Sequence, residues 1–94
     1  MFRIAIRPRA AEQIRRLRRV DAMAILDAIE SHLRDEPERV SRSRIKRLRG
    51  RPDATYRLRV GEYRVFYDVL ERQVVVTAVL HKWDTARFYR EEPR

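Results

Sequence analysis

Residues 56–69, "YRLRVGEYRVFYDV", decide the fold that we expect for this chain. The Gly-Glu pair at their centre fits a two-residue β-hairpin loop of type II′, in which glycine takes the first central position. Such a loop places Val60 opposite Tyr63 and fixes the register of both strands. Because side chains alternate across a strand, the apolar ones then fall on one face and the arginines on the other. We therefore predict a sheet with one buried face and one cationic face.

The two faces of this hairpin differ sharply in composition. The predicted core face holds Tyr56, Leu58, Val60, Tyr63, Val65, Tyr67 and Val69, whereas the opposite face holds Arg57, Arg59, Arg64, Phe66 and Asp68. In this register Arg59 lies directly opposite Arg64, and such a like-charge pair destabilises a sheet by up to about 1 kcal/mol. Folding does not require this pair, so we interpret the arginines as a binding surface. The alternative is a solvated face on which Asp68 and Glu62 relieve the repulsion.

A third strand, residues 73–82, is expected to follow a turn at Glu71 and Arg72. That turn pairs Val69 with Val74 and Arg64 with Val79. Uninterrupted alternation adds Thr77, Val79 and His81 to the arginine face, and Val74, Val76, Ala78 and Leu80 to the core.

The remaining segments predict an α+β domain. Alternating Phe2, Ile4 and Ile6 indicate an N-terminal strand, and Pro8 suits the first turn of a helix carrying Ala11, Ile14 and Leu17. Asp21 is a candidate N-cap for a second helix, which carries Ile25, Leu26, Ile29 and Leu33 and ends at Glu36 and Pro37. Residues 40–51 are expected to be part loop and part short strand, followed by strands at about 54–60 and 63–70. We predict a single domain, residues 1–94, in which an N-terminal strand and an antiparallel helix pair pack on one face of a mostly antiparallel four- to five-stranded sheet.

Positive charge dominates the composition. The 94 residues include 23 Lys and Arg against 14 Asp and Glu, a net charge of +9, and residues 42–64 alone carry nine basic side chains and two acidic ones. This balance indicates a polyanionic partner, either nucleic acid or an acidic protein. The lack of cysteine excludes a disulfide framework and a thiolate metal site. We expect no metal, no cofactor, no signal peptide and no membrane span, and hence a cytoplasmic protein.

Two segments, "KRLRGRPDATYRLRVGEYRVFYDV" (46–69) and "VVVTAVLHKWDTARFY" (74–89), resemble the RelE/ParE superfamily of bacterial type II toxins. The resemblance covers about residues 2–89 and implies a RelE-like, microbial RNase-type fold. The RelE branch consists of ribosome-dependent endoribonucleases that cut mRNA, the ParE branch inhibits DNA gyrase, and an antitoxin neutralises both. We expect a RelE-like toxin that arrests growth by inhibiting protein synthesis, held in a hetero-oligomer by an antitoxin whose acidic segment covers the basic face. The alternatives are a ParE-like gyrase inhibitor and a plain nucleic-acid-binding module.

The resemblance also implies site residues. Arg64 matches the arginine expected to hold the scissile phosphate, Lys82 falls near a second arginine beyond the last strand, and Tyr89 matches a C-terminal tyrosine. Arg57 and Arg59 match basic residues on the strand before the turn. The segment "HKWDTARFY" departs from the family pattern, because it has lysine in place of arginine and extra residues before the tyrosine.

RNA cleavage without a metal needs a base for the 2′-hydroxyl, positive charge for the phosphorane and an acid for the leaving 5′-oxygen. Arg64 is expected to stabilise the phosphorane, and His81 and Tyr89 are the proton-transfer candidates beside Lys82. The expected RNA-binding residues are Arg57, Arg59, Lys46, Arg47, Arg49 and Trp83, the last by stacking on a base. In the plainer alternatives, His81 caps a strand end, Trp83 seals the edge of the core and Tyr89 packs the C-terminal turn.

Overall fold

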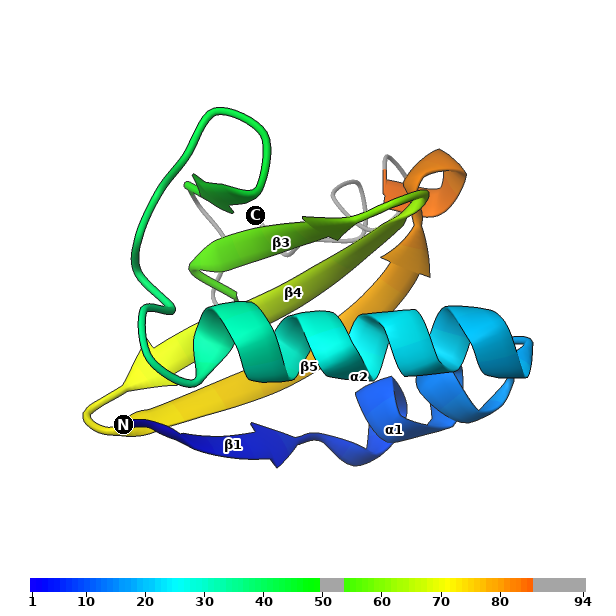
Figure 1. Cartoon of the computed structure of the whole chain (residues 1–94), viewed down its shortest axis with the longest axis horizontal. Helices are drawn as coiled ribbons and strands as arrows, with labels where there is room; N and C mark the ends of the chain where they lie inside the picture. Colours follow the sequence, from blue (N-terminus) through cyan, green and yellow to red (C-terminus); the bar gives the residue numbers. More distant parts are fainter. Residues whose placement is uncertain (50–53, 86–94) are drawn as a thin grey trace.

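The computed structural model describes residues 1–49 and 54–85 of the chain. In these residues, one five-stranded sheet carries two α-helices on one side (Figure 1). The elements are β1 (Arg3–Ile6), α1 (Pro8–Arg15), α2 (Arg19–Leu33), β2 (Ile45–Arg47), β3 (Tyr56–Val60), β4 (Tyr63–Leu70), β5 (Gln73–His81) and the 3-10 helix η1 (Lys82–Asp84). The strand order is β1-β5-β4-β3-β2, with β1 parallel to β5 and the other neighbours antiparallel. The predicted fold class is confirmed.

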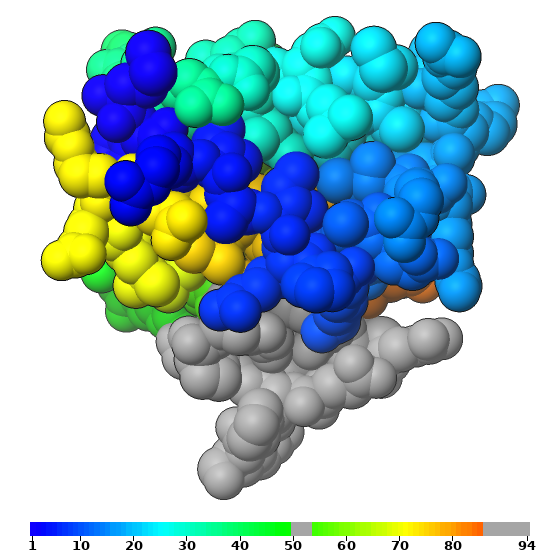
Figure 2. Space-filling view, turned by 90° about the horizontal axis from the view of Figure 1, so that it is seen from below, coloured from blue at the N-terminus to red at the C-terminus, as the bar shows by residue number. Residues whose placement is uncertain are grey.

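The main hydrophobic core lies between the helices and the sheet. From α2 it takes Ile25, Ile29 and Leu33, whose spacing of four residues places them on one helix face. The strands contribute Ile45, Tyr56, Leu58, Val65, Tyr67, Val74, Val76 and Val79. Figure 2, seen from below, shows cyan α2 as a layer above the green and yellow parts of the sheet. One face of the sheet is therefore covered by the helices, and the other face is directed away from them.

The β3–β4 hairpin has the predicted register. Val60 pairs with Tyr63, Arg59 with Arg64, and the pairing continues to Tyr56 opposite Tyr67. Gly61 has a φ of +56°, whereas Glu62 does not have a positive φ, as a type II′ loop requires. The predicted division of the hairpin into a core face and an arginine face is confirmed.

The register between β4 and β5 differs from the expected one by a single residue. Pairing next to the turn is as expected, but Arg64 lies opposite Leu80 instead of Val79. The cause is a β-bulge at Thr77, an extra β5 residue between two paired positions. The flanking pairs are Phe66 with Ala78 and Tyr67 with Val76.

This bulge inverts the alternation of side chains in the second half of β5. Val79 packs in the main core, whereas Ala78 and Leu80 belong to a small apolar cluster on the opposite face. His81 lies opposite Tyr63, a residue of the core face. The predictions that placed Val79 and His81 on the arginine face, and Ala78 and Leu80 in the core, are therefore wrong. The strand is apolar on both faces, so its sequence has no alternation that could locate the bulge.

Helix α2 begins earlier than predicted. Its first residue is Arg19, and Arg18 has the extended backbone of a cap residue, with φ −60° and ψ 151°. The prediction that Asp21 is the N-cap is wrong, because Asp21 lies within the first turn, where a carboxylate favours the positive end of the helix dipole. Its Oδ2 is 3.5 Å from Nε of Arg18. Neither helix in the described residues is long and apolar enough to cross a lipid bilayer.

Tyr67 ties the middle of the sheet to the segment between α2 and β2. Its side chain is fully buried, and its hydroxyl donates a hydrogen bond of 2.5 Å to the buried carbonyl of Pro37. The ring stacks on Tyr56, with centroids 5.5 Å apart. Burial raises the pKa of Tyr67 well above its usual range, so the hydroxyl keeps its proton and continues to donate.

The substitution Tyr67→Phe should lower the free energy of unfolding by about 1–3 kcal/mol, because the buried Pro37 carbonyl loses its partner. Urea denaturation followed by circular dichroism measures the change. The matched control is Tyr56→Phe, since no hydrogen bond of the Tyr56 hydroxyl to another described residue is present. Equal destabilisation by the two substitutions would contradict this account.

Candidate nucleic-acid interface

Four cationic side chains occupy neighbouring positions on the sheet face directed away from the helices. Lys46 on β2 lies opposite Arg57 on β3, and Arg59 on β3 lies opposite Arg64 on β4. Directly paired residues share a face of a sheet, and neighbouring strands are about 4.8 Å apart. These four residues form what is termed here the cationic face. Three successive strands thus bring like charges together, although β2 is distant from β4 in the sequence.

Asp68 and Glu62, the two carboxylates that could relieve the repulsion between these cations, have other partners among the described residues. Asp68 accepts hydrogen bonds from the hydroxyl of Thr55 at 2.5 Å and from the backbone N–H of the next residue at 2.9 Å. Glu62 forms an ion pair with Lys82. Among residues 1–49 and 54–85, the two arginines of β3 have no carboxylate at ion-pairing distance. Neither carboxylate therefore forms an ion pair with Arg57 or Arg59, whereas Arg64 is close enough to Glu62 for its charge to lower the pKa of that carboxyl.

Arg57 is held at a cost in free energy. The side chain is half-buried, and its buried Nε has no hydrogen-bond partner among the described residues. A buried donor that makes no hydrogen bond costs about 1–3 kcal/mol. The like charge of Lys46 directly across the strand pair adds to this cost. These features indicate that an arginine at this position serves binding better than it serves stability.

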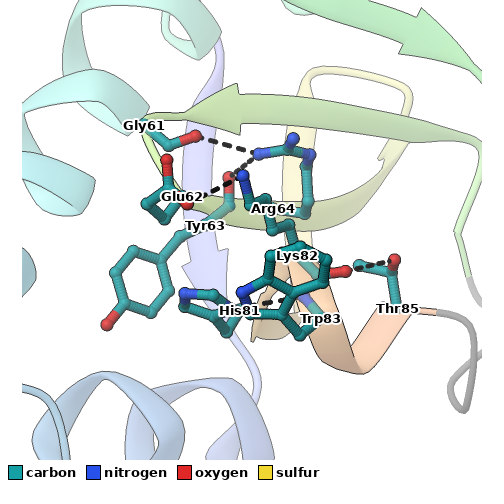
Figure 3. A network of polar contacts seen from close by, with 8 residues as sticks. All are labelled: Gly61, Glu62, Tyr63, Arg64, His81, Lys82, Trp83 and Thr85. Atoms are coloured by element: carbon teal, nitrogen blue, oxygen red, sulfur yellow. Dashed lines mark hydrogen bonds and ion pairs between the residues drawn. The ribbon is translucent and has the colours of Figure 1, made fainter.

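Arg64 lies at the loop end of the cationic face. Its Nη1 donates to the carbonyls of Gly61 at 3.0 Å and Tyr63 at 2.9 Å, so the guanidinium folds over the hairpin loop (Figure 3). The loop itself therefore positions a cation at its tip.

A second group of side chains, termed here the tip cluster, lies beside this loop and consists of Glu62, His81, Lys82 and Trp83 (Figure 3). The backbone N–H of Lys82 donates to the Glu62 carbonyl at 2.7 Å, and its Nζ is 2.9 Å from Glu62 Oε1. The hydrogen bond and charge of Lys82 lower the pKa of the Glu62 carboxyl, and His81 and Arg64 act in the same direction. Glu62 is therefore an anion at neutral pH, surrounded by basic groups.

His81 is a capping residue in this structure. Its Nδ1 accepts a hydrogen bond of 3.2 Å from the backbone N–H of Trp83 at the start of η1. An imidazole that accepts at Nδ1 carries its proton on Nε2 when it is neutral. His81 can therefore donate a hydrogen bond through Nε2 without disturbing the cap. To accept a proton at Nε2, the neutral ring would first have to carry its proton on Nδ1, and the cap would then be lost.

The ring of His81 packs against the ring of Tyr63, a contact that the sequence did not indicate. The two rings meet edge to face, with centroids 5.4 Å apart. The Tyr63 hydroxyl donates to Asp21 Oδ2 at 3.4 Å, and burial together with the Asp21 carboxylate raises the pKa of Tyr63. Tyr63 therefore stays neutral. The bulge at Thr77, which brings these rings to the same side, conceals this contact from the sequence pattern.

Trp83 is highly exposed for a large hydrophobic residue in the described part of the chain, with 76% of its surface accessible. The alternative in which it seals the edge of the core is wrong. Its ring lies 6.3 Å from that of His81 at an interplanar angle of 26°, and the Lys82 ammonium lies 4.9 Å from its centroid. An exposed indole of this kind has the chemistry to stack on a nucleobase.

The other predicted site residues fall outside these two groups. Arg47 lies opposite Tyr56 on the core side of the sheet, with its guanidinium carbon 5.9 Å from the ring centroid. Arg47 therefore does not belong to the cationic face, and its contact with RNA stays a prediction. Arg49 is exposed just beyond β2, and Tyr89 lies outside the described residues. The sequence indicated Glu62 only as a carboxylate that could relieve the repulsion between the arginines. Its ion pair follows from the pairing of Tyr63 with His81, which places the ends of β4 and β5 together.

Comparison with known proteins identifies a family and a fold. The family model described as "ParE toxin of type II toxin-antitoxin system, parDE" matches residues 4–84. The chain resembles the RelBE2 toxin–antitoxin complex of Mycobacterium tuberculosis with a TM-score of 0.73 and 26% identity, over 85% of this chain and 96% of that one. The chain also resembles a double arginine-to-alanine mutant of the E. coli toxin RelE in the free state. The TM-score is 0.69 and the identity 26%, over 97% of this chain and 93% of that one. The fold is also similar to that of an archaeal RelE–RelB complex from Pyrococcus horikoshii. The TM-score is 0.71 and the identity 23%, over 86% of this chain and 94% of that one. No curated protein matches the chain.

Replacing Arg59 should stabilise the fold. Arg59→Gln removes the like-charge pair with Arg64 and should raise the free energy of unfolding by a few tenths up to about 1 kcal/mol at low salt. Urea denaturation at low and high salt measures it, and the gain should shrink as salt screens the repulsion. The control Arg3→Gln removes an exposed strand arginine that faces the neutral Gln73. A larger gain from the control would refute the interpretation.

The tautomer of His81 can be observed directly. Long-range ¹H–¹⁵N correlation spectra, recorded where the ring is neutral, should show the proton on Nε2, because Nδ1 accepts the Trp83 N–H. His32 provides an internal reference in the same spectra. A neutral ring protonated at Nδ1 would show that the cap is absent in solution.

Proposed function

The chain belongs to the ParE toxin family, within the RelE/ParE superfamily of type II toxins, and we propose that it is an endoribonuclease that cleaves translated mRNA without a metal. The observation that supports this proposal most strongly is the cationic face. Its four like charges lie on three adjacent strands, and the charges of Arg57 and Arg59 are not neutralised by described carboxylates. A bound polyanion would supply the negative charge that the described carboxylates do not provide to Arg57 and Arg59.

The spacing of the cationic face suits a single polynucleotide strand. Arg57 and Arg59 are two residues apart on β3, so their positions repeat at roughly 6.6 Å. This is the order of the separation between successive phosphates in an extended strand. The planar guanidinium group binds phosphate oxygens in a bidentate manner, which adds direction to the charge attraction. Sequence-independent contacts of this kind position the RNA and make its binding sensitive to salt.

We assign the stabilisation of the phosphorane to Arg64, which stays charged at any ordinary pH and is positioned by the loop carbonyls. Lys82 adds a second charge, and the Nε2–H of His81 donates to a phosphate oxygen. Tyr89 remains the candidate for proton transfer that the sequence predicted. Chemistry of this kind depends on how well the substrate is held, which is consistent with a toxin that acts on mRNA within the ribosome.

A second candidate function is inhibition of DNA gyrase. Its support is the family model that matches the chain, since that model describes the ParE toxin. In this alternative the cationic face binds protein or DNA and cleaves no RNA. The partner in either case is proposed to be an antitoxin with an acidic segment on the cationic face, as the chain is similar to RelE–RelB and RelBE2 complexes.

Induction of Arg64→Ala in bacteria should abolish growth arrest and lower mRNA cleavage roughly 10²-fold, because one charge that stabilises the transition state is lost. Mapping of mRNA 5′ ends, with a plasmid supercoiling assay beside it, measures both candidate activities. Arg59→Gln should also lower cleavage, although we expect it to stabilise the fold, so misfolding cannot account for the loss.

The matched control is Arg19→Gln, which removes the same charge from the helical layer and should leave cleavage unchanged. Growth arrest with altered supercoiling and unchanged mRNA ends would favour gyrase inhibition and reject the nuclease.

A further inference from the structure

The tip cluster contains an anion of its own, and this observation deepens the proposed function on which the inference rests. We propose that the Glu62 carboxylate occupies a phosphate site of the tip cluster, as an internal anion that a phosphate of the bound polynucleotide displaces from Lys82. In this proposal the site binds phosphate groups, and a phosphate enters only by displacing the Glu62 carboxylate from Lys82.

The contact between Glu62 and Lys82 is built from two elements. The backbone hydrogen bond of 2.7 Å fixes the start of η1 against the hairpin loop, and the side chains then meet at 2.9 Å (Figure 3). The Lys82 ammonium also lies 4.9 Å from the Trp83 centroid. It is therefore held between a carboxylate and the face of an indole. Both partners attract a cation, so the ammonium has a defined position in the absence of substrate.

Further basic groups surround the same carboxylate. Arg64 is anchored to the carbonyls of Gly61 and Tyr63, the residues on either side of Glu62 in the chain. His81 comes from β5 and offers Nε2–H as a donor, since its Nδ1 is occupied by the cap. A carboxylate and a phosphate group both present anionic oxygens that accept hydrogen bonds from donors of this kind. The position that Glu62 fills is consequently suited to a phosphate.

The ion pair is easily displaced. The side chains of Lys82 and Glu62 are 36% and 60% exposed, and exposed ion pairs contribute little to stability. A free anion in solution must still compete with a carboxylate that is covalently tethered beside its partner. A polynucleotide bound by the cationic face is tethered as well, so its phosphates reach Lys82 at a high effective concentration. Glu62 therefore favours long strands over small free anions.

Displacement also changes the environment of Trp83. A phosphate that takes the place of the Glu62 carboxylate changes the anion bound to the Lys82 ammonium, which lies 4.9 Å from the Trp83 centroid. Because Trp83 is the single tryptophan of the chain, its fluorescence reports this exchange without any cleavage assay.

The test is a titration of Trp83 fluorescence with sodium tripolyphosphate, a small free polyanion, at low salt. Glu62→Gln should tighten tripolyphosphate binding about two- to fivefold relative to the wild-type chain, the size expected for one exposed ion pair. In the Lys82→Gln background the same substitution should give no gain, because the carboxylate has no ammonium to release. A 2′-O-methyl RNA oligonucleotide, which cannot be cleaved through its 2′ position, should show a smaller gain than tripolyphosphate.

The matched control is Glu71→Gln, which removes one exposed carboxylate from the β4–β5 turn at the other end of β4. It should change tripolyphosphate binding by less than about 1.5-fold. An equal gain from Glu71→Gln, a gain that persists in the Lys82→Gln background, or no gain in Glu62→Gln would each overturn the inference. These outcomes do not depend on whether the chain cleaves mRNA, so the phosphate site and the nuclease function can be rejected independently of each other.

Discussion

The structure depends on the register that the Gly61 loop imposes on the β3–β4 hairpin. A positive φ at the first loop position is accessible to glycine at no steric cost, and the two-residue loop leaves the strands a single pairing. A shift by one residue would send Leu58 and Val65 to the outer face and the arginines under α2. Burial of apolar side chains against α2 and exposure of the cationic face are thus two results of one constraint.

The cationic face reduces the stability that the core provides. Like charges meet across two strand pairs, and the buried Nε of Arg57 makes no hydrogen bond to a described residue. A domain of this size has a limited core with which to offset such terms. The face is retained at that expense, as binding surfaces are when their function conflicts with folding. An acidic partner would remove the repulsion and stabilise the toxin at the same time.

The hairpin could be predicted from sequence because its alternation is strict and its loop residues are specific. Strand β5 could not be placed fully, since "VVVTAVL" is apolar on both faces and conceals the bulge at Thr77. The cap of α2 was misplaced because Asp21 suits a first turn as well as a cap. The arginines of the hairpin followed from alternation and the loop, whereas the place of Lys46 opposite Arg57 and the tip cluster depend on strand pairing that only the three-dimensional structure reveals. Glu62 belongs to this second class.

The bulge at Thr77 has a consequence for the path of a bound strand. It turns the end of β5 so that His81 lies on the side of Tyr63, whereas Arg57 and Arg59 project from the opposite side. In the proposed nuclease, an RNA chain that follows the arginines and also contacts His81 would curve around the rim of the sheet. The linkage at the rim would then be the one at which the RNA backbone is bent.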